Sequence, residues 1–93
     1  MDNLVKVLDE CRAQIDVVDQ QLITCLAKRF KLSRTIGLIK RDSDVRIYQP
    51  NRAKEVKERY VSLGLSQGFQ RNFIVDLFQL IHEESCRIQS TEE

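Results

Sequence analysis

The sequence predicts an all-α protein of three helices, the first of which is very long. Three observations lead to this prediction: the chain has 93 residues, its apolar residues recur at alternating steps of four and three, and residues that interrupt helices are scarce. The few candidate breaks are Gly37, Pro50, Gly64 and Gly68. This length suits one domain, residues 1–93, and we find no internal repeat or linker in it.

The first helix is predicted from about Asn3 to Arg41. Its apolar stripe runs through about five heptads, with one cation where the pattern asks for leucine. The positions are Leu4, Leu8, Cys11, Ile15, Val18, Leu22, Cys25, Arg29, Leu32, Ile36 and Ile39. At 1.5 Å per residue such a helix is about 60 Å long, which is more than two shorter helices can cover. The uncovered length predicts a partner chain.

The second helix is predicted to begin at Pro50 and to end at Gly64. Proline is favoured in the first turn of a helix, because its missing N–H costs no hydrogen bond there, and glycine commonly follows the last turn. Polar residues 42–44 separate this helix from the first one. Its expected apolar face consists of Ala53, Val56, Tyr60 and Leu63.

The third helix is predicted from about Gln70 to Ser90. A wide apolar face is expected to consist of Phe73, Ile74, Leu77, Phe78 and Ile81. The same stripe continues into Ser85 and Gln89, so that a hydroxyl and an amide replace apolar groups on the inward side. Polar residues on an inward face are candidates for a binding site.

The composition excludes several classes of protein. Fifteen Lys and Arg against fourteen Asp and Glu give a net charge of +1, too balanced for general nucleic-acid binding. We find neither an apolar run long enough to span a membrane nor a signal peptide at the N-terminus, so we expect a cytoplasmic protein. The odd number of cysteines (Cys11, Cys25 and Cys86) predicts reduced, mostly packed thiols and no metal site.

Two cations interrupt the apolar pattern of the first helix on the same face. Lys40 follows Arg29 by eleven residues, and eleven steps of about 100° return to nearly the same direction. Arg12 lies about 25 Å from Arg29 along the helix, too far for both to bind one small molecule. An antiparallel dimer brings the partner's Arg12 beside this face, and Arg52 is a fourth candidate cation. The alternatives are a structural ion pair for Arg29 and a plain exposed charge for Arg52.

These inward residues together predict a small cation-rich pocket. Arg29 and Lys40 supply charge, whereas Ser85 and Gln89 supply neutral hydrogen-bonding groups. The Asp and Glu residues fall mainly on exposed helix faces, so the pocket has no evident nucleophile or general base. Such a pocket suits a compact di- or tricarboxylate rather than hydrolysis.

The same residues form motifs that resemble the all-helical chorismate mutases, and the resemblance covers nearly the whole chain. The motifs are Arg12-x2-Ile15-Asp16-x2-Asp19-x2-Leu22, Ala27-x-Arg29, Ile36-Gly37-x2-Lys40, Pro50-x-Arg52 and Phe78-x2-Ile81-x3-Ser85-x3-Gln89. The resemblance implies an intertwined antiparallel homodimer with two active sites. Each site would borrow one arginine from the partner and would need neither a cofactor nor a metal.

The resemblance also implies a role for each matching residue. Arg29 and the partner's Arg12 would bind the two carboxylates of the substrate, Ser85 would assist at the ring carboxylate and Arg52 would add charge. Lys40 and Gln89 would donate hydrogen bonds to the ether oxygen. The reaction of this family is a Claisen rearrangement, which needs no proton transfer, so that the protein acts through conformer selection and electrostatics.

Two departures from the family pattern bear on the substrate. Ala53 stands where a typical chorismate mutase has a glutamate that contacts the 4-hydroxyl of chorismate, and Gln49 stands near a frequent acidic position. The sequence is more similar to the subgroup that converts 4-amino-4-deoxychorismate to 4-amino-4-deoxyprephenate for p-aminophenylalanine and antibiotic biosynthesis. One alternative is conversion of chorismate to prephenate for phenylalanine and tyrosine. Others are an isochorismate–pyruvate lyase, which Ser85 disfavours, and a non-enzymatic helical dimer in which Arg29 and Lys40 set the register.

Overall fold

A computed structural model describes residues 2–91 as three helices and no strand, which confirms the predicted all-α class. The helices are α1 (Asp2–Asp42), α2 (Pro50–Ser66) and α3 (Arg71–Thr91). The predicted ends of the first and third helices are correct to within one residue. None of the helices in this part of the chain combines the length and the apolarity needed to cross a membrane.

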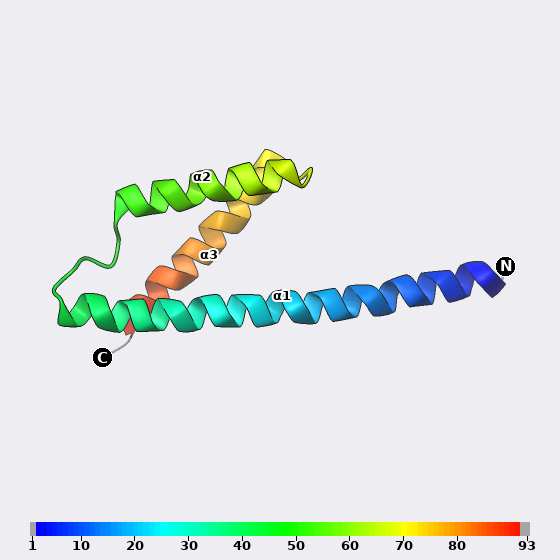
Figure 1. The fold of residues 1–93 in the computed structure, drawn as a ribbon, viewed down its shortest axis with the longest axis horizontal. Helices are drawn as coiled ribbons and strands as arrows, with labels where there is room; N and C mark the ends of the chain where they lie inside the picture. Colours follow the sequence, from blue (N-terminus) through cyan, green and yellow to red (C-terminus); the bar gives the residue numbers. More distant parts are fainter. Residues whose placement is uncertain (1, 92–93) are drawn as a thin grey trace.

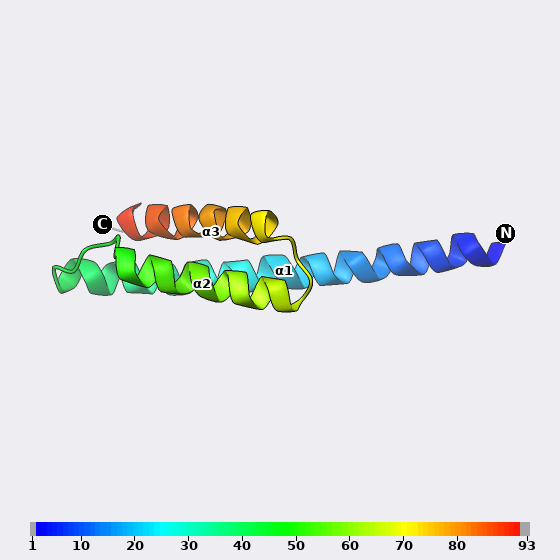
Figure 2. The same cartoon turned by 90° about the horizontal axis from the view of Figure 1, so that it is seen from above.

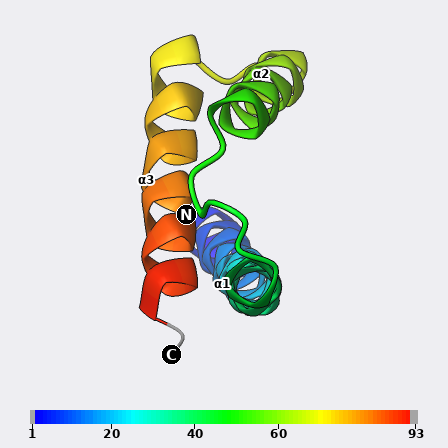
Figure 3. The ribbon, with the colours of Figure 1, turned by 90° about the vertical axis from the view of Figure 1, so that its left-hand side faces the viewer.

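The third helix holds the fold together, because it packs against both α1 and α2. Helices α1 and α2 run alongside each other without packing together, and α3 crosses them obliquely (Figure 1). Seen from above, α3 forms a second layer over the other two helices (Figure 2), and the end view shows α1 and α2 on the same side of it (Figure 3). Helix α3 is therefore the element that joins α1 to α2.

The apolar core is small and lies along α3. The buried apolar residues are Val61, Ile74, Phe78, Ile81 and Ile88. Two expected members of the apolar faces are wrong, since the side chains of Leu63 and Phe73 are 60% and 56% exposed. The reason is the oblique crossing of α3, which brings Val61 rather than Leu63 to the contact between α2 and α3.

The first helix projects far beyond the other two (Figure 1). Every residue from 3 to 25 is exposed, including most of the apolar stripe. The surface of the chain measures 7736 Å², whereas a monomeric protein of this mass exposes about 5,600 Å². The three cysteines are free, as expected of reduced thiols, but the expectation that they are mostly packed is wrong within the chain, since Cys11 and Cys25 lie exposed on α1.

Two glycines allow close contacts at α3. A Cβ atom on Gly37 would lie 2.7 Å from the Cα of Gln89, and one on Gly64 would lie 2.7 Å from the side chain of Ile74. The prediction that Gly64 ends the second helix is wrong, since α2 continues to Ser66. Gly64 is needed for packing, whereas Gly68, with φ of +84°, provides the left-handed residue that follows the helix.

A left-handed residue follows the first helix as well. Asp44 takes a left-handed conformation (φ 57°), the N–H of Val45 donates to the carbonyl oxygen of Lys40, and the N–H of Asp44 donates to that of Arg41. This pair of hydrogen bonds satisfies carbonyl groups at the end of the helix and turns the chain back. Residues 43–49 then lead from α1 to Pro50 (Figure 1).

Candidate active site

A cleft of about 500 Å³ lies between α1 and α2, within the size range of sites for small molecules. Residues of all three helices and of the 43–49 segment line it. Seven of the eight residues that the sequence singled out are in this lining: Arg29, Lys40, Gln49, Arg52, Ala53, Ser85 and Gln89. The eighth, Arg12, lies exposed on the projecting part of α1 and does not line the cleft of its own chain.

One side of the cleft is built around the guanidinium of Arg29. Its Nη1 donates a hydrogen bond of 2.5 Å to Oγ of Ser85, which is buried on α3. The Oγ of Ser33 lies 3.1 Å from Oγ of Ser85 and 3.2 Å from the carbonyl oxygen of Arg29. The buried hydroxyl of Ser85 thus fixes the half-buried guanidinium where α1 and α3 meet, and Ser33 in turn holds Ser85.

At the other side, Lys40 bridges the 43–49 segment and α3. Its Nζ donates to the carbonyl oxygen of Ile47 at 2.6 Å and to Oε1 of Gln89 at 2.8 Å. An ammonium has three N–H donors, so one remains for a ligand. Because Oε1 of Gln89 accepts from Lys40, the orientation of the amide is fixed and its NH₂ group is also left to donate. Two donors therefore converge at this end of the cleft.

The charged side chains that line the cleft are all positive. Its lining contains Arg29, Lys40 and Arg52 but no carboxylate. Within residues 2–91, neither Arg29 nor Lys40 has an ion-pair partner, so the alternative of a structural ion pair for Arg29 is wrong within the described chain. Arg52 behaves differently: its side chain is 56% exposed and lies 2.8 Å from Glu55. Burying a charge without a partner is costly, so two half-buried unpaired cations predict an anionic ligand.

The acidic residues of the neighbouring helix turns do not line the cleft. Glu84 forms a double hydrogen bond with Arg87 on the outer side of α3, and this contact lowers the pKa of the Glu84 carboxyl. The side chain of Arg87 is 60% exposed. Across residues 2–91, no group of His, Cys, Asp and Glu side chains is arranged to hold a metal ion.

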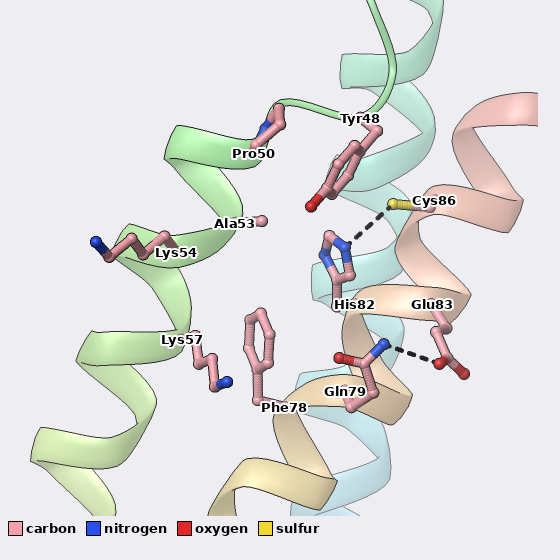
Figure 4. A pocket seen from close by; sticks show the side chains of 10 residues that line it. All are labelled: Tyr48, Pro50, Ala53, Lys54, Lys57, Phe78, Gln79, His82, Glu83 and Cys86. Carbon is pink, nitrogen blue, oxygen red and sulfur yellow. Dashed lines mark hydrogen bonds between the residues drawn. The ribbon is translucent and has the colours of Figure 1, made fainter.

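Sequence reasoning missed three polar residues of the cleft: Ser33, His82 and Cys86. Ser33 follows Arg29 by one helical turn, which is the spacing that could have found it. His82 and Cys86 share the stripe of α3 that leads to Ser85 and Gln89, which is the signal that could have found them. They also line a second, outer groove on the far side of Ala53 and Phe78 (Figure 4).

An all-helical fold around a cleft with unpaired cations, hydroxyls and an amide defines a class of proteins that bind a small polyanion. Comparison with known families makes the class specific, because residues 11–90 match the model of chorismate mutase type II. This match covers most of the chain. The chain belongs to the type II chorismate mutase family, and it is an isomerase of the mutase type.

Individual relatives differ in the reaction that their names state. A 4-amino-4-deoxychorismate mutase of Streptomyces venezuelae is 30% identical over 82 residues, which is 88% of this chain and 80% of the relative. A chorismate mutase of Methanocaldococcus jannaschii is 26% identical over 92% of this chain and 87% of the relative. A bifunctional chorismate mutase/prephenate dehydratase of Buchnera aphidicola is 36% identical over 84% of this chain, which spans only 20% of that relative.

Proposed function

We propose that this protein catalyses the Claisen [3,3] rearrangement of a chorismate-class enolpyruvyl ether. The preferred substrate is 4-amino-4-deoxychorismate, which becomes 4-amino-4-deoxyprephenate; the alternative is chorismate, which becomes prephenate. The observation that carries this proposal is the pair of half-buried cations, Arg29 and Lys40, in a cleft without carboxylates. A dicarboxylate substrate supplies the negative charge that these cations lack within the described chain.

The Arg29 side of the cleft is suited to anchor the ring carboxylate. A guanidinium presents several N–H donors in one plane and binds carboxylates in a fixed orientation. Ser85 accepts one of these donors, so its own hydroxyl proton stays available to a second carboxylate oxygen. The substrate is then held by one end in a defined direction, which is the first requirement for bringing the two reacting carbon atoms together.

The Lys40 side is suited to act on the ether oxygen. Negative charge grows on this oxygen as its bond to the ring carbon breaks. The remaining N–H of Lys40 and the NH₂ group of Gln89 are two donors already held in place by their mutual hydrogen bond. One such preorganised donor commonly lowers a barrier by about 3 to 4 kcal/mol. No proton has to move, so the absence of a carboxylate from the lining agrees with this chemistry.

We also propose that the active protein is an antiparallel homodimer in which each site receives Arg12 from the partner. The support is the exposed apolar stripe along residues 3–25 and a surface about 2,000 Å² larger than expected for a monomer of this mass. An isologous interface places the N-terminal half of one α1 beside the C-terminal half of the other. The second carboxylate of the substrate is then bound by the partner's cation.

Mixing two inactive variants tests this arrangement. Arg12→Leu and Arg29→Leu are each expected to be inactive alone. After unfolding and refolding together, half of the dimers are mixed and each has one intact site, so about a quarter of the wild-type activity returns. The measurement is the turnover of the mixture, with sedimentation to confirm dimers. If no activity returns, or if the wild type sediments as a monomer, Arg12 does not complete the site.

The substrate is tested by measuring kcat/KM with chorismate and with 4-amino-4-deoxychorismate side by side. We expect a preference of about a hundredfold for the amino compound, which corresponds to about 2.7 kcal/mol of differential transition-state binding. Support comes from the Streptomyces venezuelae relative, whereas Ala53, which stands where the family has a carboxylate at C4, predicts altered recognition of the C4 group. A preference for chorismate would assign the protein to the alternative reaction, and no turnover of either compound would contradict the proposed function.

A further inference from the structure

His82 lines the cleft, yet the proposed rearrangement gives it no part. It lies on α3 about one turn before Ser85, and its ring borders both the cleft and the outer groove. Figure 4 shows the methyl group of Ala53 on α2 and the imidazole of His82 on α3 pointing into the same space. Because Ala53 brings no polar group to this wall, the imidazole is a polar group that can contact a ligand here.

The imidazole is held firmly between neighbours. It stacks on the ring of Phe78, with centroids 5.4 Å apart and planes at 14°, and the ring of Tyr48 meets it edge-on at 5.8 Å. Its Nε2 lies 3.8 Å from Sγ of Cys86. Its other ring nitrogen has no hydrogen-bond partner among residues 2–91. A half-buried ring with a fixed orientation and a solvent-accessible nitrogen that no group of the described chain occupies is suited to bind a polar group of a ligand.

The two ends of the cleft determine which part of the substrate reaches this wall. In a chorismate-class ether the ring carboxylate is on C1, the ether oxygen is on C3 and the amino or hydroxyl group is on C4. When Arg29 and Ser85 bind the carboxylate and Lys40 and Gln89 bind the ether oxygen, C4 is opposite C1 in the ring. Because C4 is also bonded to C3, its substituent lies beside the ether oxygen and is directed away from Arg29 and Ser85, toward the wall of Ala53 and His82.

The geometry points to His82 as the residue that recognises the C4 substituent and favours a 4-ammonium over a 4-hydroxyl group. This inference rests on the proposed function and adds a specificity residue to it. A neutral imidazole nitrogen accepts a hydrogen bond from either group, but a bond from a charged donor is roughly twice as strong. The contact therefore discriminates between the two substrates.

The charged groups around His82 leave few other acceptors for an ammonium. The cations on the two sides of the ring are Arg29, Lys40, Arg52, Lys54 and Lys57. Two further acceptors, the carboxylate of Glu83 and the hydroxyl of Tyr48, line only the outer groove, and Glu83 already accepts from Gln79 at 2.8 Å. Within the cleft, the imidazole of His82 and Oε1 of Gln49 are neutral acceptors that share the lining with Ala53, and Gln49 is tied to the 43–49 segment, where its Nε2 donates to the carbonyl oxygen of Arg46.

The test compares both substrates in three variants of the full-length protein. His82→Leu is expected to lower kcat/KM for 4-amino-4-deoxychorismate about tenfold and that for chorismate about threefold, because the neutral bond lost with chorismate is roughly half as strong as the charge-assisted one. His82→Gln retains an acceptor and is expected to restore most of the selectivity. Glu83→Gln, the matched control in the outer groove, is expected to leave the ratio of the two kcat/KM values unchanged.

Each result separates this inference from the proposed function. An equal loss with both substrates in His82→Leu means that the ring only packs, and it overturns the inference while the reaction stands. A change of the ratio in Glu83→Gln but not in His82→Leu assigns recognition to the carboxylate instead, and a wild type that acts only on chorismate also overturns the inference. If the wild type turns over neither substrate, both the function and this assignment are wrong.

Discussion

Replacing Arg29 with leucine is expected to lower kcat/KM about a thousandfold, or about 4 kcal/mol, without loss of the fold. The guanidinium is half-buried, donates to Ser85 and has no carboxylate partner in residues 2–91. Removing a cation of this kind relieves a desolvation cost, so the free energy of unfolding is expected to stay equal or rise by about 1 kcal/mol. The measurements are steady-state kinetics and urea unfolding on the same preparation.

Lys31→Leu is the matched control for this substitution. Lys31 is exposed on the same helix and does not line the cleft, so its replacement is expected to leave kcat/KM within about twofold of the wild type. The role of Arg29 as a carboxylate ligand would be refuted if Arg29→Leu stayed active, or if its loss of activity followed a loss of stability.

Replacing Gly37 with alanine is expected to lower the free energy of unfolding by about 2 kcal/mol and kcat by more than tenfold. A methyl group at this position would lie 2.7 Å from the Cα and 3.0 Å from the carbonyl oxygen of Gln89. Backbone atoms cannot move aside like the end of a side chain, so α3 must shift away from α1. The shift separates Gln89 from Lys40, whose hydrogen bond holds both donors in place.

Gly68→Ala separates the two parts of this prediction. Gly68 has φ of +84° and open space around its Cα, so alanine there costs about 1 kcal/mol of backbone strain and contacts nothing in the cleft. We expect Gly68→Ala to lose stability but to keep its kcat. Equal kinetics for the two variants under conditions where both are folded would show that the close approach at Gly37 does not position Gln89.

Periodicity alone predicted the helices and the inward stripes. The steps of four and three identified the long first helix, and the polar residues that interrupt them, Arg29, Lys40, Ser85 and Gln89, all line one cleft. This worked because a residue that faces a neighbouring helix on every turn must be apolar unless it has a partner or a ligand.

Periodicity does not predict the angle at which two helices cross, so it could not predict the features that depend on this angle. Leu63 and Phe73 have the correct spacing for a buried face, but α3 crosses obliquely and covers only part of each stripe. Gly64 was interpreted as a helix end because glycine is common there. Glycine also allows two helices to approach closely, and the short distance to Ile74 shows that Gly64 has this second role. His82 was not among the predicted site residues, since its neighbours in the cleft come from other segments.

The double hydrogen bond of Lys40 affects how its own variants should be interpreted. The ammonium that would meet the ether oxygen also fastens the carbonyl group of Ile47, and with it the segment that carries Gln49 to the start of α2. A Lys40 variant therefore loses a donor and also releases one wall of the cleft. Its activity alone would overestimate the electrostatic contribution, and chemical rescue by an added small amine would separate that contribution from the tethering of the segment.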